Sequence, residues 1–117
     1  MPEGSSHLDL LALSAEIGDA ARSEDLNGLH AALCRLRNGL AAHIAMEAEA
    51  VAAMRGAADT VRNGQRRLVR LVDAMLAADD DGDGRCACIV RAAELRAGLV
   101  RQVRIEDSLG SRLEVRS

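Results

Sequence analysis

Aromatic residues and lysine are both missing from this chain of 117 residues: it has no phenylalanine, tyrosine or tryptophan, and all 15 basic residues are arginines. Without aromatic rings a protein has no platform on which bases stack, and a net charge of -3 does not attract a polyanion. We therefore expect no nucleic acid partner. The same absence means that the core is built from aliphatic side chains.

Proline is nearly absent as well, since Pro2 is the only one and lies outside every periodic segment. Hydrophobic residues make up 49% of the chain, and alanine and leucine dominate them. This composition favours helices, because alanine and leucine have high intrinsic helix propensities. A length of 117 residues predicts one domain with its own core.

Long apolar runs are also missing, and no segment has the run of about 18 apolar residues that a membrane helix needs. The apolar stretch after His7 does not resemble a signal peptide, because polar residues interrupt it at Asp9, Ser14, Glu16 and Asp19. We expect a cytoplasmic protein with no membrane partner.

Cysteine is scarce, with Cys34, Cys86 and Cys88 as the three examples. An odd number in a chain that is not exported makes reduced thiols the default. The Cys86-Ala-Cys88 pair has the residue types of a redox or metal motif. On a helix, however, its two side chains point in nearly opposite directions, which favours small core residues.

Two segments place apolar residues at alternating steps of three and four, the period of a helix face that packs in a bundle. The first seam consists of Leu26, Leu29, Leu33, Leu36, Leu40, His43, Glu47, Val51 and Met54. The second consists of Cys88, Ala92, Leu95, Leu99, Gln102, Glu106, Leu109 and Leu113. Short connections between amphipathic segments imply antiparallel neighbours. The sequence thus predicts an all-α fold, an up-down-up-down four-helix bundle with helices at about 6–22, 24–55, 60–78 and 85–109.

Several residues predict where these helices begin and end. Ser6, followed three residues later by Asp9, resembles a capping box at the start of the first helix. Ser23 is expected to begin the second helix, and Gly56 to end it as a left-handed cap. Gly110 is expected to interrupt the fourth.

Each seam is broken by a pair of polar residues, His43 with Glu47 and Gln102 with Glu106. Seam positions point into the core, where a carboxylate costs several kcal/mol unless it is paired or bound to a cation. His43 and Glu47 are four residues apart, so both side chains can reach one metal ion from the same helix face. Two such breaks in two helices indicate a site.

These motifs resemble the hemerythrin-like, or HHE cation-binding, family over nearly the whole chain. Residues 36–47, LRNGLAAHIAME, resemble the motif in which a His and a Glu four later bind iron, and residues 95–107, LRAGLVRQVRIED, resemble the fourth-helix motif. His7 followed by Leu10 matches the opening H-x-x-L pattern, and Gly64-Gln65 stands where the third helix often carries Glu-His. The resemblance implies a four-helix bundle that holds non-haem iron and serves oxygen binding, oxygen or redox sensing, or iron handling.

The chain departs from the family pattern at two expected histidines, which are replaced by Gln65 and Gln102. Amides are poor iron ligands compared with imidazole. The aromatic-proline signature is missing too, because residues 48–54 and 108–113 contain neither tyrosine nor proline. The ligands that the resemblance implies here are His7, His43, Glu47 and Glu106. Four ligands hold one ion but not a complete di-iron centre, so a mononuclear centre, a weak centre and a lost centre all stay open.

Two other interpretations compete with a metal centre. The seam glutamate can instead pair with an arginine such as Arg70, Arg96 or Arg101. In that case the chain is a metal-free helical adaptor or chaperone-like protein that binds a partner through an apolar helix face. An enzyme is not expected, since no nucleophile with its base, phosphate-binding glycine loop or acid-base pair of carboxylates is evident.

The acidic joint before the fourth helix resembles the opening of a calcium-binding EF-hand loop, with Asp79, Asp81, Asp83 and Gly84 in place. The position that supplies the bidentate glutamate is Val90 instead. We therefore expect no high-affinity calcium site. Negative charge just before a helix N-terminus accounts for the aspartates.

Overall fold

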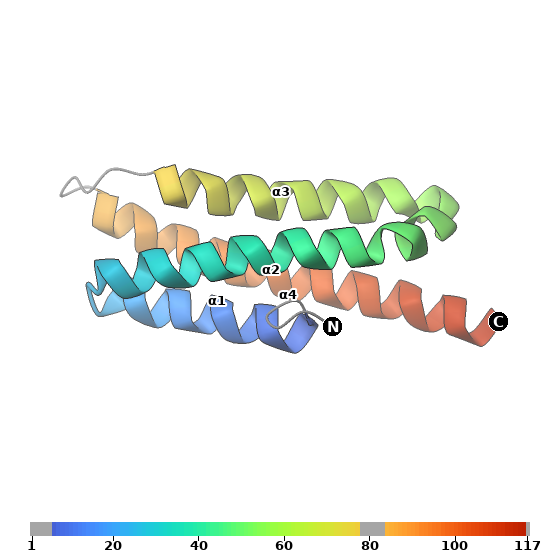
Figure 1. Cartoon of the computed structure of the whole chain (residues 1–117), viewed down its shortest axis with the longest axis horizontal. Coiled ribbons are helices and arrows are strands. Elements are labelled where there is room, and N and C mark those ends of the chain that lie inside the picture. The colour runs from blue at the N-terminus through green and yellow to red at the C-terminus, as the bar shows by residue number, and fades with distance from the viewer. Residues whose placement is uncertain (1–5, 78–83, 117) are drawn as a thin grey trace.

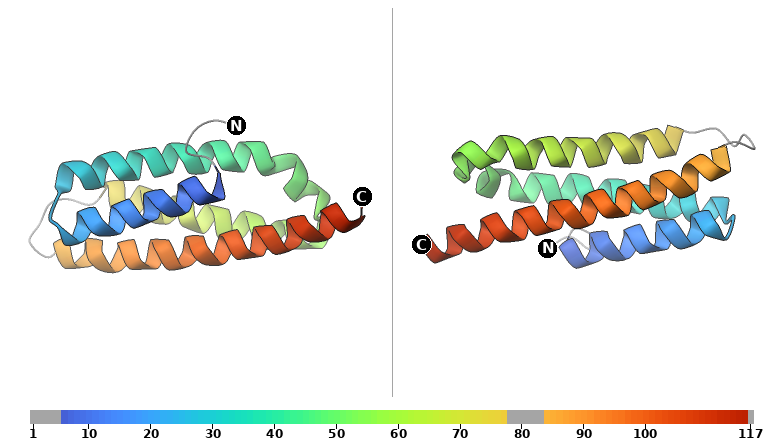
Figure 2. Two further views of the ribbon diagram at one scale, coloured as in Figure 1. Left: turned by 90° about the horizontal axis from the view of Figure 1, so that it is seen from below. Right: turned by 180° about the vertical axis from the view of Figure 1, so that it is seen from behind.

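Four long helices run in alternating directions along the computed structural model, which describes residues 6–77 and 84–116, the latter without the side chains of 84–88 and 110–116 (Figure 1). The helices are α1 (His7–Arg22), α2 (Leu26–Ala53), α3 (Ala58–Ala77) and α4 (Gly84–Arg116), with a short 3-10 helix, η1 (Arg55–Ala57), between α2 and α3. Each helix packs against the next, and α4 returns to pack against α1 (Figure 2). This closed ring confirms the predicted all-α up-down-up-down bundle.

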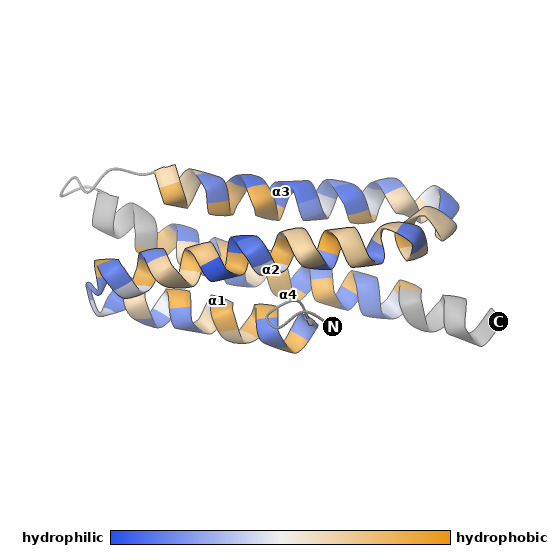
Figure 3. Ribbon diagram, in the orientation of Figure 1, coloured by the Kyte–Doolittle hydropathy of each residue, from blue (hydrophilic) through white to orange (hydrophobic). Residues whose placement is uncertain are grey.

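The core is aliphatic, as the composition predicts, and the seam of α2 supplies much of it. Leu29, Leu33, Leu36 and Leu40 are all buried, whereas Leu26, at the first position of the helix, is exposed. In Figure 3, α3 is largely hydrophilic and its hydrophobic residues lie on the side toward the other helices. The buried residues of the main cluster from α1, α3 and α4 are Leu10, Leu13, Ile17, Ala21, Leu68, Val72, Met75, Ala92, Leu95 and Leu99.

The first connection differs from the prediction. Ser6 does cap α1, because its Oγ accepts the N–H of Asp9 at 3.1 Å. Ser23, however, ends α1 instead of beginning α2, since its backbone N–H donates to Asp19 O. Asp25 is the N-cap of α2 and accepts the N–H of Gly28 at 2.9 Å. A carboxylate that reaches this free N–H sets the start of the helix two residues later than predicted.

The prediction of a left-handed cap at Gly56 is also wrong. Arg55 adopts the positive φ of 52°, and Gly56 lies within the 3-10 turn that leads directly into α3. Gly110 does not interrupt the last helix either, because α4 continues to Arg116. A glycine costs a helix about 1 kcal/mol relative to alanine, which the rest of a long helix can offset.

Unequal helix lengths position the candidate site. Helix α1 has 16 residues and α4 has 33, so the N-terminal end of α1 lies beside the middle of the bundle rather than at its end (Figure 1). None of the described helices combines the length and apolar character that crossing a membrane requires. The calcium prediction concerns Asp79, Asp81 and Asp83, which lie outside the described residues.

Candidate metal centre

Three side chains from three helices converge where α1 begins. His7 is the first residue of α1, His43 comes from the seam of α2, and Glu106 from the seam of α4. His43 and Glu106 are each 7% exposed, and His7 is partly buried at the edge of the group. One ligand atom from each of the three lies within 4.8 Å of the others. The structure thus brings together three of the four ligands named from the sequence.

The three atoms that face one another form a small triangle. His43 Nε2 lies 2.9 Å from Glu106 Oε1 and 3.2 Å from His7 Nε2, and the third side, from His7 Nε2 to Glu106 Oε1, is 3.6 Å. The two imidazole rings are tilted by 53°, with their centroids 4.7 Å apart.

These separations suit a first-row metal ion. Three atoms so spaced share a centre about 1.9 Å from each, close to the bond lengths of about 2.0–2.2 Å for histidine nitrogen and carboxylate oxygen. Two imidazoles and one carboxylate are the donor set typical of non-haem iron(II). The described residues therefore fit a mononuclear metal ion.

Asp107 holds the far side of the His7 ring. Its Oδ1 lies 2.9 Å from His7 Nδ1, so that Nδ1 donates a hydrogen bond and Nε2, without a proton, is the atom that can bind a metal. Carboxylates behind metal-binding histidines act in this way, orienting the ring and raising its basicity. Asp107 is not among the ligands predicted from the sequence. In the sequence, only the position of Asp107 directly after Glu106 points to a role at the site. Adjacent residues on a helix usually contact different neighbours, so this position alone is a weak indication.

The charge of Glu106 is stabilised inside the bundle. Burial raises the pKa of this carboxyl, but the hydrogen bond and the charge of His43 oppose that effect, together with a hydrogen bond from Gln102 and the charge of His7. The pKa of Glu106 is consequently below its ordinary value. The carboxylate remains ionised and available as a ligand, and its partner is a histidine rather than one of the arginines considered from the sequence.

Gln102 lies in the interior, one turn before Glu106, as the seam predicts. Its Nε2 donates to the backbone oxygen of Val61 on α3 at 3.0 Å, and the residue is 5% exposed. Its amide also hydrogen-bonds Glu106. Gln102 thus borders the site and positions the carboxylate.

Glu47 and Gln65 take different places from the three convergent residues. Glu47 is half-buried on α2, one turn beyond His43, and is not among the side chains whose ligand atoms lie within 4.8 Å of one another. Gln65 is buried on α3, as expected, but lines a pocket beside Ile44. The structure therefore separates both from the three-residue group.

The cysteines contribute no described ligand to this group. Cys34 is a free thiol on α2, with its Sγ 3.6 Å from Nε2 of His30. The side chains of Cys86 and Cys88 lie outside the described residues.

Comparison of the chain with models of protein families, with curated proteins and with solved structures found no match.

Proposed function

We propose that the chain is a hemerythrin-like bundle that binds one non-haem iron ion through His7, His43 and Glu106, and that it serves oxygen or redox sensing or iron handling in the cytoplasm. The observation that carries the proposal is the triangle of two imidazole nitrogens and one carboxylate oxygen. The resemblance to the hemerythrin-like family supports iron as the metal and dioxygen as its ligand.

Each residue of the site has a distinct part in the proposal. His43 and Glu106 would hold the ion from the bundle interior, where burial limits competition from water. His7 would complete the set from the edge, oriented by the hydrogen bond to Asp107. When bound, iron(II) supplies a redox-active centre with coordination positions left open for a small molecule.

The hemerythrin-like family normally has a histidine at the position of Gln102. Its replacement by glutamine favours a centre with one iron ion over a centre with two. The amide of Gln102 is occupied by the oxygen of Val61 and by Glu106, so it has no need of a metal to satisfy it. The described residues that converge here number three, too few for a bridged pair of iron ions. We therefore propose a mononuclear centre.

Anaerobic reconstitution tests the proposal. Protein treated with a chelator is incubated with iron(II), desalted and analysed for iron, and about one equivalent is expected. His43→Ala and Glu106→Gln should each reduce retained iron severely, because each removes a buried ligand. The matched control is His30→Ala, which removes an exposed histidine from the same helix as His43 and should retain iron like the parent. Equal retention in all variants would contradict the site.

Glu47→Gln addresses the fourth ligand implied by the family resemblance. Since the Glu47 carboxylate lies outside the convergent group, we expect this variant to lower iron affinity much less than Glu106→Gln. Equal losses from the two substitutions would show that Glu47 joins the centre when iron binds.

A metal-free adaptor is the second candidate, and one feature favours it. A groove of about 570 Å³ runs between α1 and α4, and its lining includes the small residues Gly18, Ala93 and Ala97. Small residues let a partner helix approach closely. A proton on His43 Nε2 would also satisfy Glu106 without a metal. Failure to retain iron after reconstitution would favour the adaptor.

A further inference from the structure

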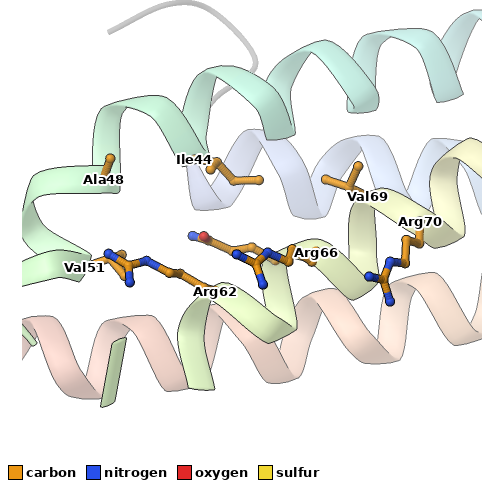
Figure 4. Close-up of a pocket in the computed structure, with 8 residues that line it drawn as sticks. Ile44, Ala48, Val51, Arg62, Arg66, Val69 and Arg70 are labelled. Carbon is orange, nitrogen blue, oxygen red and sulfur yellow. The ribbon is translucent and has the colours of Figure 1, made fainter. Parts of the chain in front are cut away.

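A separate pocket of about 370 Å³ opens between α2 and α3, within the size range of small-molecule sites. One wall of the pocket is charged and the opposite wall is apolar. Figure 4 shows the guanidinium groups of three arginines along one side and apolar side chains of α2 opposite them. The lining residues are Ile44, Ala48, Val51, Arg62, Gln65, Arg66, Val69 and Arg70.

The arginines follow one another at intervals of four residues, so they share one face of α3. Among the described residues, no carboxylate lies within ion-pair distance of Arg62, Arg66 or Arg70, unlike Arg22, Arg35 and Arg37. Other exposed arginines, such as Arg67, are also without a carboxylate partner in this part of the chain. Like charges spaced by four on a helix repel one another. A bound anion would remove that repulsion.

Gln65 adds a second and independent indication of a ligand. It is 5% exposed, it lines the same pocket as the arginines, and its Nε2 has no hydrogen-bond partner among the described residues. Buried polar atoms in proteins are nearly always hydrogen-bonded, because an unpaired donor has lost its contacts with water and gained nothing. An acceptor atom supplied by a ligand would satisfy this amide.

We propose that this pocket binds a small amphiphilic anion, a carboxylate or phosphate head group on a short apolar chain. Planar guanidinium groups bind such oxyanions with two parallel hydrogen bonds, which a row of three arginines can offer. The apolar chain packs on Ile44, Val51 and Val69. The site uses none of the proposed iron ligands and is independent of the metal.

Calorimetric titration of the whole chain tests the proposal with octanoate and octyl phosphate as probes. Both are expected to bind, while octylammonium and inorganic phosphate bind at least about tenfold more weakly. In NMR spectra of labelled protein, the side-chain amide signals of Gln65 shift with octanoate. If one of the two probes binds more tightly, its head group indicates whether the natural ligand is a carboxylate or a phosphate.

Matched variants locate the site. Arg66→Ala is expected to weaken octanoate binding about tenfold, because it removes one charged hydrogen-bonding partner. Arg67→Ala removes the same charge from an adjacent exposed position that does not line the pocket, and its affinity should stay within about twofold of the parent. Gln65→Leu keeps the volume of the side chain, removes the unpaired amide and should also weaken binding. Circular dichroism confirms that the variants fold.

Three results would overturn the proposal. The first is the absence of octanoate and octyl phosphate binding by the parent. The second is an equal loss of affinity in Arg66→Ala and Arg67→Ala, which would indicate nonspecific attraction to surface charge. The third is binding to phosphatidylglycerol vesicles without binding to either soluble probe, which would make the arginine row a membrane-surface contact instead of a pocket.

Discussion

Gln102 on α4 occupies the space that the missing side chain of Gly64 leaves on α3. A Cβ at Gly64 would lie 2.7 Å from Cδ of Gln102, well inside contact distance. From this place the amide of Gln102 reaches the oxygen of Val61 and hydrogen-bonds Glu106. The glycine therefore contributes to the candidate site without touching it, at the cost of weaker helix propensity in α3.

Gly64→Ala is expected to destabilise the protein in spite of a gain of about 1 kcal/mol in helix propensity. The new methyl group displaces the amide of Gln102, and breaking its buried hydrogen bonds costs about 1–3 kcal/mol. Urea unfolding of Gly64→Ala, Gln102→Ala and the double variant gives the coupling between the two positions. The double variant should be more stable than the sum of the single changes predicts, and additive effects would contradict the contact.

Leu40→Ala should lower the free energy of unfolding by about 2–5 kcal/mol, because Leu40 is 2% exposed in the main core cluster. The matched control is Leu26→Ala, on the same helix but 52% exposed, which should cost far less. Chemical denaturation compares the two. A loss below about 0.5 kcal/mol at Leu40 would be that of a surface position and would contradict the packing of α2.

The stability of the metal-free protein should fall in acid through Glu106. Its folded pKa is below the ordinary value, so the unfolded chain takes up the proton first as the pH falls. The contribution of this group is complete above the ordinary glutamate pKa of about 4.3 and is lost as the pH falls through the folded pKa.

Unfolding free energies are therefore measured between neutral pH and pH 3 for the parent and for Glu106→Gln. This substitution should remove part of the pH dependence in the acid range, because it removes the carboxyl whose pKa is lowered in the folded protein. Glu49→Gln, which removes one carboxyl from an exposed position of α2, is the matched control for the change in charge. If the unfolding free energy of the parent depends on pH in the same way as that of Glu106→Gln, the Glu106 carboxylate is not stabilised by its histidine partners.

Asp107→Asn is expected to weaken metal binding by about 10–100-fold, since the amide orients the His7 ring less well and does not raise its basicity. Cobalt(II) serves as the probe because its absorption reports coordination by the ring nitrogens. Unfolding stability should change little, as Asp107 is exposed. Glu94→Gln, an exposed substitution on the same helix, is the control. Unchanged cobalt affinity in Asp107→Asn would separate Asp107 from the metal site.

Restoring histidines should strengthen iron binding. Gln102→His together with Gln65→His would add two imidazole donors to the bundle interior. We expect most of the gain from Gln102→His, because that side chain already hydrogen-bonds Glu106, whereas Gln65 lines the arginine pocket. The variants are loaded with iron(II) anaerobically and then oxidised, and a charge-transfer spectrum absent from the parent is the readout. Iron affinity no better than that of the parent would contradict the hypothesis that Gln65 and Gln102 stand where histidines once bound the metal.

The regular spacing of apolar residues explains why the sequence was sufficient to predict the bundle and the burial of most polar residues of the site. Polar residues at seam positions are expected to point inward, so steps of three and four residues predicted the burial of His43, Gln102 and Glu106, although Glu47 on the same seam is only half-buried. Helix ends were less predictable. The choice between Ser23 and Asp25 as the cap of α2 depends on which side chain reaches a free N–H, and residue type does not distinguish the two.

The amino-acid sequence by itself determined four amphipathic helices, an aliphatic core and the polar residues that enter it, because each of these depends on neighbours within a turn or two. Tertiary structure alone decided which polar residues meet. His7 and Asp107 are 100 positions apart, and they pair only because the short α1 begins beside the C-terminal half of α4. Glu47 and Gln65 share the helical pattern of the other site residues, yet they are separated from the three-residue group. The axial offsets and rotations of packed helices set such distances, and no local pattern encodes them.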